Sequence, residues 1–145
     1  MTDLATRNPE ETEAAGERLG RQLRSGDVVY LIGDLGSGKT CFARGLALGV
    51  GAPASEVASP TFALIHEYAG GGGETILRHL DLYRLPDRAR DLESIGVPDT
   101  LAGAPVAVEW PGEAIRTLLP PTVEVTIVRA GGDGDGERKI RIDRM

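Results

Sequence analysis

Apolar and polar residues follow two different periods in the first third of the chain. Asn8, Pro9 and the two glutamates after them are typical of a helix start, because asparagine caps free amides, proline fits the first turn and acids complement the helix dipole. Apolar residues then recur every four positions, so we predict a helix that ends at Ser25-Gly26. The continuous apolar run at 28–32, VVYLI, predicts a buried strand.

A second helical pattern covers 39–50, where apolar residues share one face: Phe42, Ala43, Leu46, Ala47 and Val50. Residues 51–60 are predicted to form a loop. Further strands are predicted at 61–68, 74–83 and 106–108 and in the alternating runs at 123–127 and 140–142, with helices at 86–95 and 112–119. The glycine-rich stretches GGGG and GGDGDGE between strands predict the turns of two hairpins.

These elements predict one α/β domain over residues 1–145, with a partly parallel sheet and β-hairpins. No internal repeat or linker interrupts the chain. In such a sheet ligands bind at the carboxyl ends of the central strands. The site is therefore expected after the strand at 28–32 and its neighbours.

The segment GDLGSGKT, residues 33–40, lies between the predicted buried strand and the following helix. Its spacing is that of a phosphate-binding loop, in which backbone N–H groups surround a phosphate. Gly36 and Gly38 let the chain turn without Cβ clashes, Lys39 supplies a cation for the β- and γ-phosphates, and the Thr40 hydroxyl ligates Mg²⁺. The strand before it and the helix after it argue against a chance glycine-rich turn.

A magnesium site on a nucleotide also needs a carboxylate, and two residues qualify. Glu109 ends the apolar stretch PVAVE, and Asp81 lies in HLDLYR on the same strand face as His79 and Tyr83. Each also has an ordinary structural explanation, as a strand-end cap or a solvated strand carboxylate. Because Glu109 ends an all-apolar strand, we expect it to lie nearer the metal, with Asp81 acting through water or on the nucleophile.

Three other features have both a functional and a structural interpretation. Ser59-Pro60-Thr61 follows the predicted helix, and its threonine hydroxyl is placed to sense a γ-phosphate; an ordinary turn is the alternative. Trp110 is the one tryptophan, and an aromatic residue at a strand end more often belongs to a core or an interface. The arginines at 84, 88 and 90 fit a phosphate lid or, more commonly, a solvated helix face.

Composition narrows the function. The chain has 145 residues, 41% of them hydrophobic, which is enough for one core. Its net charge is −6 and it has no basic stripe, so direct nucleic-acid binding is not favoured. A single cysteine and the lack of a membrane-length apolar stretch favour a cytoplasmic protein without membrane contact.

Four motifs occur in order: GDLGSGKT, SPTF, HLDLYRL and VEWPGE. Together they resemble the TsaE family (older name YjeE), bacterial P-loop ATPases needed to make threonylcarbamoyladenosine on tRNA. The resemblance runs from about the first helix to Leu119. It implies a three-layer P-loop NTPase-like fold, ATP and Mg²⁺ as cofactors, and TsaD and TsaB as protein partners, with tRNA contacted only through their complex.

Carried over by position, the resemblance assigns catalysis to Lys39, Asp81 and Glu109, and the metal to Thr40, Glu109 and Asp81. The nucleotide-binding positions are Gly33, Gly36, Ser37, Gly38, Lys39, Thr40, Cys41, Thr61 and Trp110. A second threonine is common where this chain has Cys41, but there the backbone N–H faces the phosphate, so the replacement changes little.

Two rival functions remain for the sequence alone: a small-molecule kinase, which needs an acceptor pocket, and a nucleotide-binding module that does not hydrolyse. Formation of ADP without an acceptor distinguishes the ATPase from both of these alternatives. We expect Lys39 to be exposed in its loop, and the isolated chain to be a weak ATPase, because no second positioned cation is evident.

Overall fold

The computed structural model describes residues 1–58, 64–130 and 136–145. The strands are β1 (Thr2–Thr6), β2 (Val28–Ile32), β3 (Ile65–Ala69), β4 (Thr75–Asp81), β5 (Val106–Glu109), β6 (Val123–Arg129) and β7 (Arg138–Arg144). The helices are α1 (Pro9–Gly20), α2 (Lys39–Val50), α3 (Ala54–Ala58), α4 (Ala89–Ser94), the 3₁₀ helix η1 (Val97–Leu101) and α5 (Glu113–Leu118). No helix in these ranges combines the length and apolar character that crossing a membrane requires.

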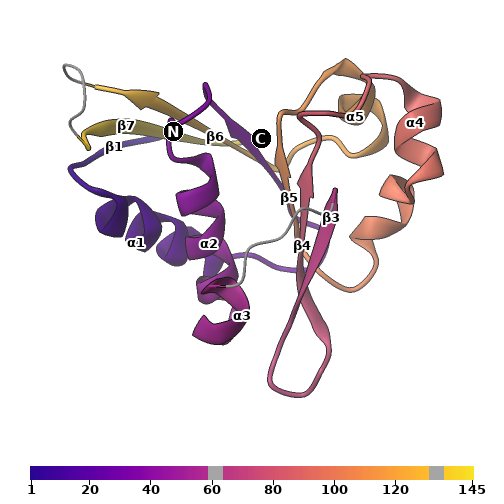
Figure 1. Cartoon of the computed structure of the whole chain (residues 1–145), viewed down its shortest axis with the longest axis horizontal. Helices are drawn as coiled ribbons and strands as arrows, with labels where there is room; N and C mark the ends of the chain where they lie inside the picture. The colour runs from indigo at the N-terminus through magenta and orange to yellow at the C-terminus, as the bar shows by residue number, and fades with distance from the viewer. Residues whose placement is uncertain (59–63, 131–135) are drawn as a thin grey trace.

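All seven strands form one sheet in the order β1-β7-β6-β2-β5-β4-β3 (Figure 1). Strand β2 pairs in parallel with β5 and β6, and β4 pairs in parallel with β5. The outer pairs β3–β4, β6–β7 and β1–β7 are antiparallel. The predicted α/β fold with a partly parallel sheet and β-hairpins is therefore confirmed.

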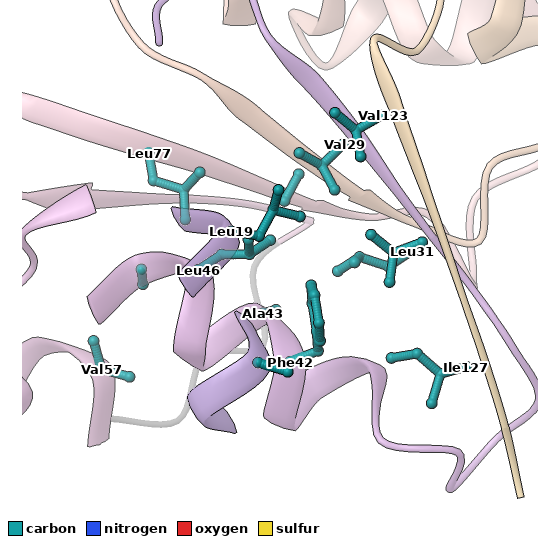
Figure 2. Close-up of a cluster of buried hydrophobic side chains, with 14 of the residues drawn as sticks. Leu19, Val29, Leu31, Phe42, Ala43, Leu46, Val57, Leu77, Val123 and Ile127 are labelled. Carbon is teal, nitrogen blue, oxygen red and sulfur yellow. The ribbon is translucent and has the colours of Figure 1, made fainter. Parts of the chain in front are cut away.

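Helices cover the sheet on both sides, giving three layers (Figure 1). Helices α1 and α2 pack on one face, where Leu19, Phe42 and Leu46 meet strand residues such as Val29 and Ile127 (Figure 2). Helices α4, η1 and α5 cover the other face around Tyr30, Leu80 and Val108. Strand β2 is buried on both faces because it lies at the centre of the sheet, which explains its uninterrupted apolar sequence.

Helices α1 and α2 approach each other closely because glycines face each other. A Cβ on Gly45 would lie 2.0 Å from the Glu13 carbonyl oxygen, and one on Gly16 would lie 2.2 Å from the Phe42 carbonyl oxygen. Gly20 and Gly49 are similarly crowded by backbone atoms of the opposite helix. This contact sets α2, and the loop that precedes it, firmly against α1.

Several element boundaries were predicted correctly. Helix α1 begins as expected, with Asn8 Oδ1 accepting the Glu11 N–H at 2.8 Å and Pro9 in the first turn. Helix α2 spans the predicted 39–50 and is capped at its C-terminus by Gly51, whose φ of 112° is left-handed. The GGGG turn joins β3 and β4 as predicted, although β3 begins at Ile65 and the first predicted strand residues, 61–63, lie outside the described part.

Other boundaries were wrong. Helix α1 ends at Gly20 and not at Ser25-Gly26, because Gln22 and Leu23 bond three residues back and tighten the chain into turns. Strand β1 was not predicted, since TDLAT has little apolar alternation and is held by pairing with β7. Helix α3 lies in the predicted 51–60 loop; it begins after Pro53 and buries Val57, but is too short for a periodic pattern.

Candidate nucleotide-binding site

The loop between β2 and α2 depends on its three glycines. Gly36 and Gly38 have φ of 76° and 112°, backbone angles that residues other than glycine rarely adopt. A Cβ on Gly33 would lie 2.5 Å from the Ile127 carbonyl oxygen. The loop therefore enters the first turn of α2 with room for backbone N–H groups to face a ligand, as expected of a phosphate-binding loop.

Lys39 is buried, at 4% exposure, which corrects the expectation that it is exposed. Its Nζ donates to the carbonyl oxygens of Gly33 at 2.5 Å and Asp34 at 2.8 Å, so the side chain folds back under the loop. Burial lowers the pKa of Lys39, while Glu109, Asp34 and Asp81 act in the opposite direction. Sequence reasoning missed this burial because the loop is held against the residues that follow β5.

Trp110, directly after β5, forms one wall of the site. Its φ of 61° makes it the one non-glycine residue with positive φ in the described chain, a strained conformation for a bulky residue. The Lys39 ammonium lies 4.1 Å from the centre of the indole ring. The centres of the Tyr83 and Trp110 rings are 4.9 Å apart. These contacts stabilise the strained backbone and place an aromatic face beside the lysine.

The two candidate carboxylates are neighbours in the sheet. Asp81 and Glu109 lie opposite each other in the parallel pairing of β4 and β5, at the carboxyl ends of both strands. Because side chains alternate along a strand, Glu109 shares the face of Ala107, which packs toward α1 and α2. The pleat thus directs both carboxylates to the side where Lys39 and Thr40 begin α2.

Their environments differ. Glu109 is 4% exposed, and its Oε2 lies 2.7 Å from His79 Nε2, also buried. Asp81 is exposed and accepts one hydrogen bond, from the Tyr83 N–H at 3.2 Å. His79 was not predicted to act at the site; its place two residues before Asp81, on the same strand face, was the available signal.

A hollow of about 420 Å³ opens beside the loop. Most of the predicted site residues line it: Gly36, Gly38, Lys39, Thr40, Cys41, Asp81, Glu109 and Trp110. Pro9, Leu35, Arg44 and Tyr83, which were not predicted, line it as well. A larger hollow of about 820 Å³ lies on the open face of β1, β6 and β7, away from the loop, and has no comparable set of groups.

The remaining predicted residues lie elsewhere. Gly33 and Ser37 line smaller hollows behind the loop, and the Ser37 hydroxyl is buried without a hydrogen-bond partner among the described residues. Thr61, with Ser59 and Pro60 of the predicted switch segment, lies outside the described residues.

The groups in the hollow fit the phosphates of a nucleotide and Mg²⁺. Magnesium takes oxygen ligands, commonly one or two carboxylates together with substrate phosphates and water, and the site offers Asp81, Glu109 and the exposed Thr40 hydroxyl. The loop supplies backbone donors at a helix N-terminus. Parallel strands at the centre of the sheet, this loop and carboxylates at neighbouring strand ends define a P-loop nucleotide-binding fold.

Comparison with known proteins narrows this class. A family model described as "Threonylcarbamoyl adenosine biosynthesis protein TsaE" matches residues 6–140. The chain is 40% identical to the tRNA threonylcarbamoyladenosine biosynthesis protein TsaE of Treponema pallidum, over 91% of this chain and 94% of that protein. It is 40% identical to the Bacillus subtilis protein of the same name, over 93% and 80%. The chain belongs to the TsaE family.

A solved structure agrees with this assignment. The crystal structure of Bacillus subtilis YdiB superposes with a TM-score of 0.70 at 31% identity, covering 99% of this chain and 84% of that one. The resemblance drawn from the four motifs is thus confirmed at the level of family and fold.

Proposed function

We propose that this chain is a Mg²⁺-dependent ATPase that supports threonylcarbamoyladenosine modification of tRNA together with TsaD and TsaB. The observation that carries the proposal is that Lys39, Thr40, Asp81 and Glu109, from three separate segments, line one hollow at a phosphate-binding loop. Membership of the TsaE family supplies the pathway. Residues 1–145 would act as a single domain in the cytoplasm.

The roles follow from position. The loop N–H groups and the Lys39 ammonium bind the phosphates, for which Nζ exchanges its present carbonyl acceptors for phosphate oxygens. The Thr40 hydroxyl and the Glu109 carboxylate hold Mg²⁺, which supplies charge neutralisation when bound. The more exposed Asp81 orients the attacking water, and Trp110 closes the site beside Lys39.

Two features support dependence on partners. Leu35 and Tyr83, both lining the hollow, are 62% and 51% exposed, so the mouth of the site presents apolar surface to a docking protein. Two basic side chains line this hollow, Lys39 and Arg44, and that of Arg44 is exposed. A partner that covers the mouth would exclude water and position cations, as phosphoryl transfer requires.

The test is ADP formation by the chain alone, with TsaB and TsaD, and with tRNA alone, without any small-molecule acceptor. We expect slow turnover alone, stimulation by the two proteins and none by tRNA, because the net charge of −6 does not favour RNA binding. Lys39→Ala should remove turnover in every arm, whereas Lys139→Ala, on the open face of β7, should not. Full turnover by the lone chain, or an absolute need for an acceptor, would contradict the proposal.

A further inference from the structure

Two arginines hold the outer side of the phosphate loop. Arg138 Nε donates to the Ser37 carbonyl oxygen at 2.7 Å, and another nitrogen of the same guanidinium donates to the Gly36 carbonyl oxygen at 3.3 Å. Arg129 donates to the same Gly36 oxygen at 3.4 Å. We call Arg129 and Arg138 the arginine pair. Arg129 ends β6 and Arg138 begins β7, the two strands of the last hairpin of the chain. Both lie more than ninety residues after the loop.

The arginine pair is an unfavourable placement on its own. Arg129 and Arg138 lie directly opposite each other in the β6–β7 ladder, where like charges destabilise a sheet. Hydrogen bonds from charged donors to carbonyl oxygens are among the stronger ones. The loop carbonyls accept hydrogen bonds from both guanidinium groups and so contribute against this repulsion.

Peptide geometry links these outer carbonyls to the inner N–H groups. In a planar trans peptide the C=O of one residue and the N–H of the next point in opposite directions. The Ser37 carbonyl points to Arg138, so the Gly38 N–H points away from Arg138, into the loop. The Gly36 carbonyl likewise directs the Ser37 N–H inward, where it bonds the Asp34 carbonyl oxygen at 3.1 Å. Holding the carbonyls thus fixes the direction of the donors.

The loop is also shaped to receive these side chains. A Cβ on Gly36 would lie 2.5 Å from a guanidinium nitrogen of Arg129, so glycine at this position leaves space for the arginine as well as permitting its φ of 76°. From the other side, Lys39 holds the carbonyls of Gly33 and Asp34. Cations on both sides of the loop therefore bind its carbonyl oxygens and leave the inward N–H of Gly38 for a ligand.

We propose that Arg138, assisted by Arg129, is a positioning residue for nucleotide binding: it holds the phosphate loop in its binding conformation and polarises the Gly38 N–H through the Ser37 carbonyl. The proposal rests on the proposed nucleotide-binding function. It gives the last hairpin a supporting role in a site whose lining residues lie between Pro9 and Trp110.

The experiment uses the whole chain with Arg138→Met, and with Arg144→Met as the matched control. Arg144 is on the same face of β7, six residues along the strand, and bonds Gln22, so its loss removes the same charge away from the loop. ADP affinity is measured by calorimetry. The amide order parameters of Ser37 and Gly38 are measured by ¹⁵N relaxation in the absence of nucleotide, where a rigid backbone gives about 0.85.

We expect Arg138→Met to weaken ADP binding about tenfold, the order of one charge-assisted hydrogen bond, and to lower both order parameters. Arg144→Met should leave both measurements unchanged, and Arg138→Lys, which keeps the charge but not the forked geometry, should be intermediate. If Arg138→Met does not fold, Arg129→Met provides the same two measurements, since Arg129 is exposed and makes one bond to the loop.

Unchanged ADP affinity would overturn the proposal. Weaker binding with unchanged order parameters would also overturn it, because the arginine would then act on the phosphate directly. If the wild-type chain binds no ADP, the proposed nucleotide-binding function fails instead, and this result is distinguishable because it does not involve the variants.

Discussion

The buried carboxylate of Glu109 accepts a hydrogen bond from the imidazole of His79, which is also buried, with Oε2 and Nε2 2.7 Å apart. The two residues lie on neighbouring parallel strands, β4 and β5. The bond occupies one carboxylate oxygen and leaves Oε1 without a hydrogen bond in the described part of the chain. His79 therefore aims Glu109 at the hollow beside the phosphate loop.

His79→Phe should lower ATP turnover by about 10- to 100-fold, the range found when a partner that orients a metal ligand is lost. The affinity for ADP without Mg²⁺ should change little, because His79 does not line the hollow. His79→Gln, whose amide nitrogen reaches a similar position, should restore part of the turnover. Equal turnover in wild type and His79→Phe would show that the bond has no role in the reaction.

Glu109 and Asp81 should differ in their effect on magnesium. We expect Glu109→Gln to raise the Mg²⁺ concentration needed for half-maximal nucleotide binding more than Asp81→Asn does, because Glu109 is the buried, oriented carboxylate. Asp81→Asn should instead lower turnover at saturating Mg²⁺. Magnesium titrations of both isosteric variants provide the measurement, and the reverse order would make Asp81 the principal ligand.

Gly45→Ala should destabilise the fold by about 3 kcal/mol, at the upper end for overpacking, because the new methyl group meets backbone and not a movable side chain. Its Cβ would lie 2.0 Å from the Glu13 carbonyl oxygen and 2.9 Å from Gly16 Cα. Denaturant unfolding measures the change. Gly71→Ala, at a hairpin tip with no atom within 4 Å of the new Cβ, is the control and should change stability little.

Tyr30 should make stability depend on alkaline pH. Burial raises its pKa from 10.0 to about 12, against the lowering effect of Arg116, and its hydroxyl donates to the Leu119 carbonyl oxygen at 2.6 Å. A raised folded-state pKa contributes stability that is complete below pH 10 and is lost as pH rises toward about 12. The loss should amount to about 1 to 3 kcal/mol after allowance for solvent screening.

Unfolding free energies of wild type and Tyr30→Phe across this pH range test the prediction. The wild-type curve should fall more steeply than that of Tyr30→Phe, while Tyr83→Phe, at a half-exposed position, should follow wild type. Parallel curves for wild type and Tyr30→Phe would show that another group titrates. The comparison is needed because the lowered pKa of Lys39 acts in the opposite direction.

Local chemistry made the phosphate loop predictable. The buried strand, the three glycines and the helix that follows are contiguous, and each glycine is required by the backbone at its own position. The bounds of α2 and the pairing of β3 with β4 depend on neighbouring residues in the same way. Periodicity and spacing are sufficient signals for such features.

Other features depend on contacts that no local pattern encodes. Strand β1 exists because β7, at the other end of the chain, pairs with it. The ammonium of Lys39 is buried against Trp110, which is distant in the sequence. The hydrogen bond between His79 and Glu109 joins residues 30 positions apart, and the one between Arg138 and Ser37 joins residues 101 positions apart. Carboxylates at two strand ends suggested a site, but their partners could not be chosen from the sequence.

The sequence by itself determined the P-loop and the central buried strands, and four ordered motifs in it determined the family. Each of these features depends on residues that are adjacent in the sequence. Only the tertiary structure decided that Lys39 is buried, that His79 orients Glu109 and that the last hairpin holds the loop. The strand order places these segments side by side, and that order results from packing two apolar faces of one sheet rather than from any local preference.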